Sequence, residues 1–518
     1  MHQDDRHPPP DGGGCFYKGE WQHMSTITKH EDRGRYHFSP AAKWMNDPNG
    51  MVFFEGEYHL FFQHHPHGMT WGPMHWGHAV SRDLVTWEEL EIALAPDEHG
   101  AIFSGSAVVD WKNTTGFFDG EPGLVAIFTH HIEAEDGRPQ VQTQSLAYSK
   151  DKGRTWIKYE GNPVLSEASL PDFRDPKVFW HEETGRWVMI LACGQTVRLY
   201  HSPDLKAWTF ASEFGEGIGF HDGVWECPDL FPLTAGGESG VTKWVMLVSI
   251  GDSPEYPEGS RTQYFTGDFD GLAFTPDDVS HQVRWLDGGR DNYAGVSWSD
   301  VPAEDGRRLY VGWMSNWKYA NLTPTEGFRG AMTLPRELRL ETREDGLVLI
   351  QEPVRELERI RVPVLSLTDV TAAEAAEALG GLQMDSYELN VTLPAGASCS
   401  FDLRKGQDGC VTRVGVDADA NEVYVDRTAS GRFEFHEQFA GVHRAALGSG
   451  SPVELRIFVD RSSVEVFADG GRAVITDLIF PDPDSKGLSF SASDPRLELT
   501  SLAVYSLQPA GSPQEQAR

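Results

Sequence analysis

Hydrophobic residues in the first two thirds of the chain fall into short runs separated by polar turns. The runs are rich in β-branched and aromatic residues, which favour strands. They occupy residues 52–54, 58–62, 124–128, 187–191, 244–248 and 309–313. Long patterns of helical period are missing between them, so the sequence predicts an all-β module over residues 35–343.

A short repeat indicates how these strands are arranged. Ser-x-Asp turns that follow a strand-like run and precede a tryptophan occur at residues 81–83, 149–151 and 202–204. A repeated sheet cannot bury both of its faces alone, and copies of it close into a ring. We therefore expect a β-propeller.

Beyond residue 343 the pattern changes. The Glu and Arg content of residues 344–363 predicts a linker. Residues 364–510 then alternate between apolar and polar positions, for example at 387–391 and 455–459, and a hairpin signal of the Asp-Gly-Gly type follows at 469–471. This alternation is typical of half-buried antiparallel strands and predicts a β-sandwich.

The two ends of the chain lack these patterns. Residues 1–34 are largely rich in Pro, Gly and acidic residues and are predicted to be disordered, and residues 511–518 are predicted to form a tail. Neither Met1 nor Met24, the two candidate starts, is followed by the apolar stretch of a secretory signal. We therefore expect a cytoplasmic protein, or a secreted one if the start has been altered.

Charge and composition limit the partners. The formal net charge of −34 argues against nucleic acid, because binding a polyanion needs clusters of Lys and Arg. No run approaches the roughly 20 apolar residues that span a bilayer, so no membrane association is expected. The five Cys are too scattered for a disulfide framework or a zinc site. A neutral carbohydrate meets no electrostatic penalty at such a surface, and a monomer or homodimer is expected.

Three motifs each place one carboxylate among aromatic, Pro and Gly residues. They are Trp-Met-Asn-Asp-Pro-Asn-Gly at 44–50, Phe-Arg-Asp-Pro at 173–176 and Trp-Glu-Cys-Pro-Asp at 225–229. Any one of them alone is ordinary turn chemistry. Together they supply Asp47, Asp175 and Glu226, and two or three carboxylates are the minimum set for cleaving a glycosidic bond.

These motifs, in this order, resemble the signature of the β-fructosidases, glycoside hydrolase family 32, which includes levanases, inulinases and invertases. Further segments carry the resemblance: 61–63, 70–72, 76–79, 103–106 and 312–314. The resemblance implies a five-bladed β-propeller followed by a β-sandwich, with no cofactor and no metal. It also implies a retaining double displacement through a fructosyl-enzyme, with Asp47 as nucleophile, Glu226 as acid/base and Asp175 as transition-state stabiliser.

The resemblance extends to a fructose pocket with polar groups for the hydroxyls and aromatic faces for the ring. The residues expected to bind substrate are Asn46, Gln63, Trp71, Phe103, Ser104, Arg174, Tyr293 and Trp313. Arg174 is expected to keep Asp175 ionised through a charge-assisted contact.

A group of histidines offers a competing interpretation. His64, His65, His67, His75 and His78 could indicate a transition metal. Their spacing differs from the i, i+4 helical pair of the zinc proteases, and they fall in a strand and loop segment, so packing is favoured over a metal site.

Four functions stay open. The stretch from Phe103 to Trp111 looks most like bacterial levanases and exo-inulinases, which favours release of terminal fructose from levan or inulin. A sucrose-specific invertase or sucrose-phosphate hydrolase would share the catalytic residues, as would a fructosyltransferase. A catalytically silent sugar-binding propeller is disfavoured by the three intact carboxylates.

Overall fold

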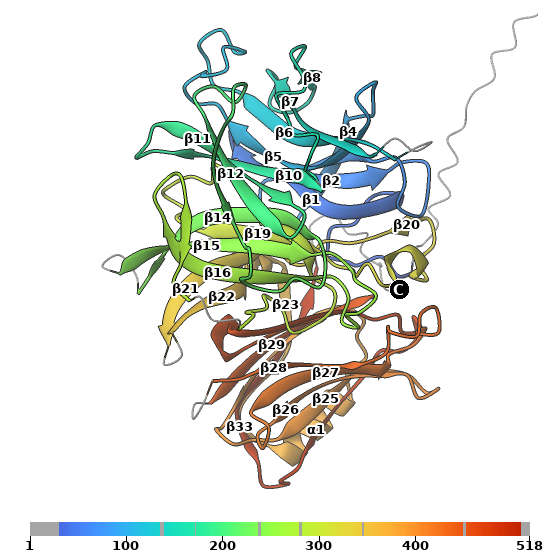
Figure 1. Ribbon diagram of the computed structural model, residues 1–518. Coiled ribbons are helices and arrows are strands. Elements are labelled where there is room, and N and C mark those ends of the chain that lie inside the picture. Colours follow the sequence, from blue (N-terminus) through green and yellow to red (C-terminus); the bar gives the residue numbers. More distant parts are fainter. Residues whose placement is uncertain are drawn as a thin grey trace, which may run out of the picture.

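The computed structural model describes residues 31–134, 139–170, 172–236, 240–278, 282–343, 346–448 and 452–508. Figure 1 shows two β-rich modules, one above the other, with the N-terminal module on top. The predicted tail, 511–518, and most of the segment predicted to be disordered, residues 1–30, lie outside the described residues. Residues 31–34, the last of that segment, form a turn in which Arg33 donates hydrogen bonds to Ser39 and to the carbonyl oxygen of Pro40.

Five antiparallel sheets build the N-terminal module. The first contains β1 (Lys43–Phe54), β2 (Glu57–His65), β3 (His75–Ser81) and β4 (Trp87–Leu94), and the second contains β5 (Ala101–Val109), β6 (Leu124–Ile132), β7 (Val141–Ser149), β8 (Ile157–Lys158) and β9 (Leu165–Ser166). The third contains β10 (Phe173–His181), β11 (Arg186–Cys193), β12 (Thr196–Ser202) and β13 (Thr209–Phe214). The fourth contains β14 (Trp225–Ala235), β15 (Val241–Ile250), β16 (Arg261–Phe269) and β17 (Phe274–Pro276), and the fifth contains β18 (Tyr293–Ser297), β19 (Arg308–Trp313), β21 (Arg336–Arg343) and β22 (Gly346–Pro353).

The first strand of each sheet is the innermost one. Strand β1 contacts β5, β5 contacts β10, β10 contacts β14, β14 contacts β18, and β18 returns to β1. A short strand late in the module, β20 (Phe328–Arg329), pairs in parallel with β1 and joins the two ends of the ring. The sheets are therefore the five blades of a β-propeller, as predicted.

The Ser-x-Asp repeat marks one turn in three successive blades. Ser81, Ser149 and Ser202 end the third strand of their sheets, and each hydroxyl donates to the Asp two residues later at 3.1, 2.8 and 3.2 Å. The Asp carboxylates then accept backbone N–H groups of the turn. Each turn is followed by a tryptophan that lies at or directly before the start of the fourth strand of its sheet. The repeat therefore follows the symmetry of the propeller.

Two sheets of a β-sandwich form the C-terminal module. One contains β23 (Arg361–Thr371), β33 (Glu498–Leu507), β24 (Tyr387–Leu393), β29 (Val453–Asp460), β30 (Ser463–Ala468) and β31 (Ala473–Leu478). The other contains β28 (Val442–Ala446), β27 (Glu422–Ala429), β26 (Val411–Asp417), β25 (Cys399–Lys405) and β32 (Gly487–Ala492). Inward positions of both sheets share one apolar core, as the predicted alternation requires. The turn predicted at 469–471 is the 3₁₀ turn η3 (Asp469–Gly471) between β30 and β31.

The boundary between the modules differs from the prediction. Residues 344–363 were expected to be a linker, but β22 lies within this range. It pairs with β21 along its whole length, with Arg336 opposite Pro353 and Arg343 opposite Gly346, and completes the fifth blade. The apolar side chains of Leu349 and Ile350 are buried there. The segment therefore packs as a strand of the blade, although charged residues flank it. The connection itself is the 3₁₀ turn η2 (Arg355–Ile360), after which β23 begins.

Buried charges and apolar side chains join the two modules. Arg336 of the propeller is fully buried and donates to Glu465 of the sandwich at 2.6 Å and to Asp287 at 3.2 Å. The His37 ring lies between Asp460 and Glu465, at 2.8 Å from each. An apolar cluster that includes Met45 on the propeller side and residues of β29 to β31 surrounds these groups. The modules therefore share a core.

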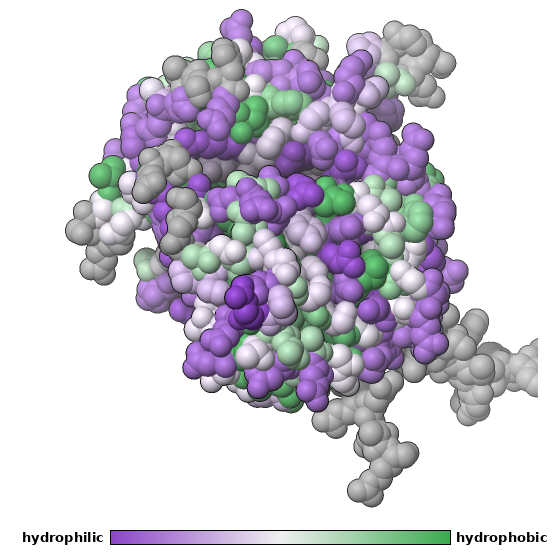
Figure 2. All heavy atoms as spheres, turned by 90° about the horizontal axis from the view of Figure 1, so that it is seen from below, coloured by the Kyte–Doolittle hydropathy of each residue, from purple (hydrophilic) through white to green (hydrophobic). Residues whose placement is uncertain are grey.

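The surface is largely polar. Figure 2 shows the face seen from below, where hydrophilic residues predominate and hydrophobic ones form small scattered groups. The α-helix α1 (Ala372–Gly380) packs against β32 and β23 of the sandwich. Among the described residues, no helix is both long enough and apolar enough to cross a membrane.

Candidate active site

All five innermost strands are irregular near their N-terminal ends. The pairing register shifts at 45–48 in β1, 102–105 in β5, 174–177 in β10, 226–229 in β14 and 293–296 in β18. A β-bulge of this kind bends the strand and re-aims a side chain. Because the five strands surround one axis, the five bulges point their side chains into one space.

The motifs of the sequence explain why the bulges form there. Pro48, Pro176 and Pro228 have no N–H for the sheet ladder, and a bulge is one of the few places where a strand tolerates proline. Asp175 and Cys227 adopt left-handed backbone conformations, with φ of 62° and 45°. Each catalytic candidate lies beside or inside such an irregular segment.

Asp47, Asp175 and Glu226 line a single pocket of about 420 Å³. They come from β1, β10 and β14, so segments nearly 180 residues apart in sequence meet here. The other residues at its wall are Asn46, Gln63, Trp71, Phe103, Ser104, His131, Glu133, Gln140, Gln142, Asp172, Arg174, Trp317 and Asn321. This set contains every predicted site residue except Tyr293 and Trp313.

Asp47 is held by hydrogen bonds at both carboxylate oxygens. Asn46 Nδ2 donates to Oδ1 at 2.9 Å, and Ser104 Oγ donates to Oδ2 at 2.7 Å. Asn46 is itself fixed by the indole N–H of Trp44, at 2.7 Å. Burial raises the pKa of Asp47, the Ser104 hydrogen bond opposes this rise, and the charge of Glu226 adds to it.

Asp175 is the most buried of the three carboxylates. The backbone N–H of Cys227 donates to its Oδ2 at 3.0 Å. Burial raises the pKa of Asp175 to about 7; Arg174 opposes this rise, and the charges of Glu226 and Asp47 add to it. The cluster therefore retains a proton well above the ordinary range of a carboxyl group.

The thiol of Cys227 lies between Asp47 and Asp175. Its Sγ is 3.6 Å from Oδ2 of each. Burial raises the pKa of this thiol well above its ordinary value, so it stays protonated and acts as a weak donor. Of the described cysteines, Cys193, Cys227, Cys399 and Cys410 are all free and buried.

Arg174 pairs with Glu226 more closely than with Asp175. Its Nη2 donates to Oε1 of Glu226 at 2.9 Å, and its Nη1 donates to Asp172 at 2.6 Å. The distance from Nε to Oδ2 of Asp175 is 3.9 Å. The predicted contact with Asp175 is therefore an ion pair without a hydrogen bond, and the hydrogen-bond partners of Arg174 are Glu226 and Asp172.

Tyr293 and Trp313 lie behind the pocket. The hydroxyl of Tyr293 donates to Oε2 of Glu226, and Trp313, which is fully buried, packs edge-on against the Tyr293 and Trp44 rings. Trp317 takes the place at the wall that Trp313 was expected to fill. Trp313 reaches the site only through its neighbours, because its strand position points into the blade core.

The remaining predicted residues line the pocket. Gln63 is buried and donates to Asn49 Oδ1 at 2.7 Å. Trp71 is more than one third exposed at the rim, where its ring packs edge-on against Phe103. The backbone N–H of Trp71 donates to Asn321 Oδ1 at 2.9 Å. Aromatic faces therefore stand at the mouth and polar groups at the floor.

Sequence reasoning missed one side of the rim. His131 and Gln142 are paired residues near the adjoining ends of β6 and β7, Glu133 and Gln140 lie in the connection between these strands, and Asp172 directly precedes β10. Trp317 and Asn321 come from the segment after β19. Asp172 directly precedes the Phe-Arg-Asp-Pro motif, and its position two residues before Arg174 was a usable signal. The others carried no local pattern, since loop residues are placed by blade packing.

The histidines are held by the main chain or by each other. Nδ1 of His64, His65 and His75 lies 2.8, 2.9 and 3.0 Å from the carbonyl oxygens of Trp44, Thr70 and Pro73. The His78 ring hydrogen-bonds to His59. In the described part of the chain, no group of three or more His, Cys, Asp or Glu is arranged to hold a metal ion.

Three carboxylates that converge on one pocket at the centre of a β-propeller, with aromatic faces at its mouth, define a glycoside hydrolase. Residues 37–353 match the "Glycosyl hydrolases family 32 N-terminal domain", and residues 356–506 match the "Glycosyl hydrolases family 32 C terminal". The chain belongs to glycosyl hydrolase family 32, as its motifs predicted.

Individual relatives agree with this assignment. A levanase of Bacillus subtilis is 51% identical over 92% of this chain and 70% of its own length, and a levanase of a Bacillus species is 42% identical over 92% of this chain and 52% of its own length. The chain thus spans about half to two thirds of these two levanases. The crystal structure of an exo-inulinase from Aspergillus awamori matches with a TM-score of 0.83 and 35% identity, covering 92% of this chain and 98% of that one.

Proposed function

We propose that this protein is a retaining exo-β-fructosidase that releases terminal fructosyl residues from fructans of the levan or inulin type and also hydrolyses sucrose. The observation that carries the proposal is the convergence of Asp47, Asp175 and Glu226 in one pocket. The names of the relatives, levanase and exo-inulinase, support the same substrate class.

In the first step Asp47 forms a bond to C2 of the fructosyl unit while the C2–O bond to the leaving group breaks. Glu226 gives its proton to the departing oxygen, so the leaving group departs as a neutral alcohol. Asp47 suits the nucleophile because Asn46 and Ser104 fix both of its oxygens. These bonds also hold its negative charge until the new covalent bond forms.

In the second step water attacks C2 of the fructosyl-enzyme. Glu226, now ionised, takes the proton of the water, and the C2–O bond to Asp47 breaks. The two displacements together retain the anomeric configuration. Arg174 and Tyr293, which both donate to Glu226, hold its carboxyl group in position for this step.

Asp175 acts on the fructosyl unit without forming a bond to it. Its carboxylate faces the same space as Asp47 and accepts the backbone N–H of Cys227. An ionised carboxylate at this place accepts hydrogen bonds from sugar hydroxyls and strengthens them as positive charge develops at C2 and the ring oxygen. We assign Asp175 as the transition-state stabiliser.

Exo action follows from the dimensions of the site. The pocket of about 420 Å³ is closed at its floor by the bulges of the inner strands, and Trp71 and Phe103 stand at its rim. A closed pocket accepts the end of a chain, whereas an internal unit would need a cleft open at both ends. The leaving group then lies against the ends of β6 and β7 that carry His131 and Gln142.

Product analysis tests this function. The purified protein is incubated with levan, inulin and sucrose, and the products are separated by anion-exchange chromatography. Free fructose as the sole early product from either polymer, together with glucose and fructose from sucrose, is the expected result. A ladder of oligosaccharides would show endo action, longer products would show transfer, and the absence of any turnover would refute the proposed function.

A further inference from the structure

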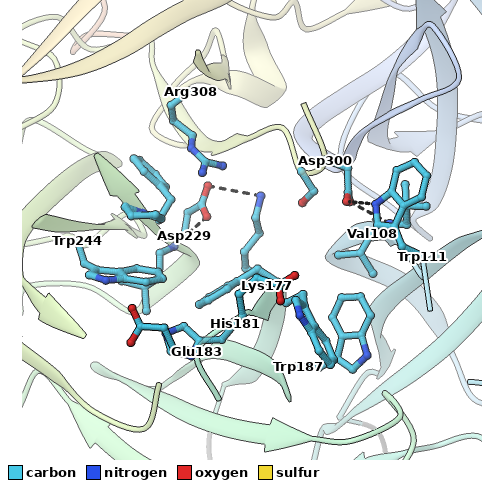
Figure 3. Close-up of a pocket in the computed structure, with 18 of the residues that line it drawn as sticks. Val108, Trp111, Lys177, His181, Glu183, Trp187, Asp229, Trp244, Asp300 and Arg308 are labelled. Carbon is cyan, nitrogen blue, oxygen red and sulfur yellow. Dashed lines mark hydrogen bonds and ion pairs between the residues drawn. The ribbon is translucent and has the colours of Figure 1, made fainter. Parts of the chain in front are cut away.

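A second and larger cavity lies at the other end of the inner strands. Its volume is about 660 Å³, and Figure 3 shows the residues that line it. Strand β10 carries Arg174 and Asp175 to the active site and Lys177 and Phe179 to this cavity. Strand β14 likewise carries Glu226 to the first and Asp229 to the second. The two sites are therefore opposite openings of the propeller axis.

The inner end of this cavity holds two cations and two carboxylates. Lys177 Nζ lies 3.5 Å from Asp229 Oδ2 and donates to the carbonyl oxygen of Ser297. Asp300 accepts the N–H of Val109 at 2.9 Å and the indole N–H of Trp111 at 2.8 Å. Arg308 points toward Asp229 in Figure 3. These four charges balance at the inner end, and the lining as a whole, which also contains Lys112, Glu182 and Glu183, carries one net negative charge.

The guanidinium of Arg308 has N–H groups that make no hydrogen bond to the described residues. Its Nη1 contacts the carbonyl oxygen of Trp298 at 3.3 Å and Ser297 Oγ at 3.5 Å. Among the described residues, Nε and Nη2 have no hydrogen-bond acceptor, and no carboxylate lies within ion-pair distance of the guanidinium. A planar donor group that lines a cavity in this state is suited to a ligand with hydroxyl oxygens.

Aromatic rings form the walls. Trp111, Trp180, Trp187 and Trp244 all line the cavity, and Figure 3 places Trp244 and Trp111 on opposite sides of it. Trp111 is 56% exposed although it is a large aromatic side chain. Flat aromatic faces combined with balanced polar groups match the two surfaces of a sugar ring, its apolar C–H face and its hydroxyl edge.

We propose that this cavity, opposite the active site, is a second carbohydrate-binding site that takes a fructosyl unit of the polymer whose chain end is cut on the other face. The identity of the sugar rests on the proposed function. Binding at two openings of one propeller would hold a branched or neighbouring polymer chain near the enzyme without taking part in the reaction.

The test compares a polymer with a small substrate. Trp111→Ala removes the exposed wall, and Phe210→Ala is the matched control, because Phe210 on β13 is 49% exposed and lines neither site. We expect Trp111→Ala to raise KM for levan roughly five-fold, the loss of about 1 kcal/mol of binding, with kcat unchanged. Turnover of sucrose, which is too small to reach both openings at once, should stay as in the wild type for both variants.

A direct binding measurement accompanies the kinetics. The Asp47→Asn protein and its Trp111→Ala, Trp244→Ala and Phe210→Ala derivatives are run through native gels with and without levan. Retardation by levan should decrease in both tryptophan derivatives and persist in the Phe210→Ala derivative. Equal retardation in all of them, an unchanged KM for levan, or occupation of the site by inorganic phosphate in preference to levan would overturn the proposal. Failure of the proposed function would instead appear as no turnover of sucrose or levan by the wild type.

Discussion

The hydroxyl of Tyr293 and the carboxyl group of Glu226 form a direct hydrogen bond at the back of the pocket. A tyrosine hydroxyl donates to an ionised carboxylate and accepts from a protonated one, so it fits both states of an acid/base residue. Trp313, which packs against the Tyr293 ring, fixes its position. The bond therefore links a residue that does not line the pocket to the proton transfer in both steps.

Replacing Tyr293 by phenylalanine tests this link. We expect kcat for sucrose to fall by roughly 10- to 100-fold, with KM changed much less, because the hydroxyl acts on Glu226 and makes no contact with bound sugar. Steady-state kinetics gives both constants. Tyr310→Phe, which removes a buried hydroxyl that donates to Asn292 and does not contact Glu226, is the control. A larger effect of Tyr293→Phe on KM than on kcat would refute the assigned role.

Asp47→Ala and Glu226→Ala should each reduce turnover of fructosides by several orders of magnitude without unfolding the protein. The two variants differ with an activated substrate. Fructosyl fluoride needs no proton at its leaving group, so Glu226→Ala should still form the fructosyl-enzyme, and azide should restore turnover by replacing the base-assisted water. Asp47→Ala should respond to neither, and equal rescue of both variants would contradict the assignment.

Ionisation of the buried Asp175 carboxyl group is predicted to lower the free energy of unfolding as pH rises. Its pKa is raised from 3.8 to about 7, so the folded protein keeps a proton that the unfolded chain loses as pH rises through 3.8. The contribution of this group to the free energy of unfolding therefore falls between pH 3.8 and 7 and stays low above it. Asp175→Asn mimics the protonated form at every pH.

Thermal melts of the wild type and Asp175→Asn at several pH values check this expectation. The Tm of the variant minus that of the wild type should increase as pH rises from 4 to 8. The corresponding change in the free energy of unfolding is a few kcal/mol at most. Its activity should be lost throughout. A Tm difference that does not change with pH would show that burial does not raise the pKa of the Asp175 carboxyl group.

His37 is predicted to stabilise the junction of the modules in its charged form. Burial alone would lower its pKa, but the hydrogen bonds to Asp460 and Glu465 raise it from 6.5 to about 9. Its contribution to stability is fully present below pH 6.5 and is lost as pH rises through 9. The pKa of Asp460 is lowered from 3.8 to about 2, so its contribution is present above pH 3.8 and lost as pH falls through 2.

The variant His37→Gln isolates this effect. It should lower the free energy of unfolding by up to about 3 kcal/mol at pH 6 and by much less at pH 10. Urea unfolding followed by tryptophan fluorescence measures the difference. Because the junction is one core, a single transition is expected for both modules, and a destabilisation that is equal at the two pH values would contradict the role of the charged histidine.

The strands and the catalytic carboxylates could be predicted because their signals are local. Val-rich and aromatic runs such as 244–248 identify strands by composition, and Asp47 and Glu226 stand inside motifs with Pro and Gly. The helix α1 was missed although Thr371 and Glu374 form a capping box in the structure, because its nine residues are fewer than a periodic pattern needs. Strand β22 was misassigned to the linker because charged residues surround its apolar positions.

The depth of a residue in the site could not be predicted in the same way. Trp313 and Trp317 are four residues apart and equally aromatic, yet only Trp317 lines the pocket. Which of them does so depends on the bulge in β18 and on the segment that follows β19, and both are set by contacts with other blades. The same holds for the second cavity, whose residues come from several blades and share no motif.

The stereochemistry of transfer to methanol tests the double displacement most directly. Sucrose is incubated with the enzyme in water containing methanol, and the methyl fructofuranoside formed early is identified by NMR, since free fructose would equilibrate too quickly to report its initial form. Two displacements at C2, by Asp47 and then by methanol, predict the methyl β-fructofuranoside. Early formation of the α-anomer would show a single inverting displacement and would contradict the assignment of Asp47 as nucleophile.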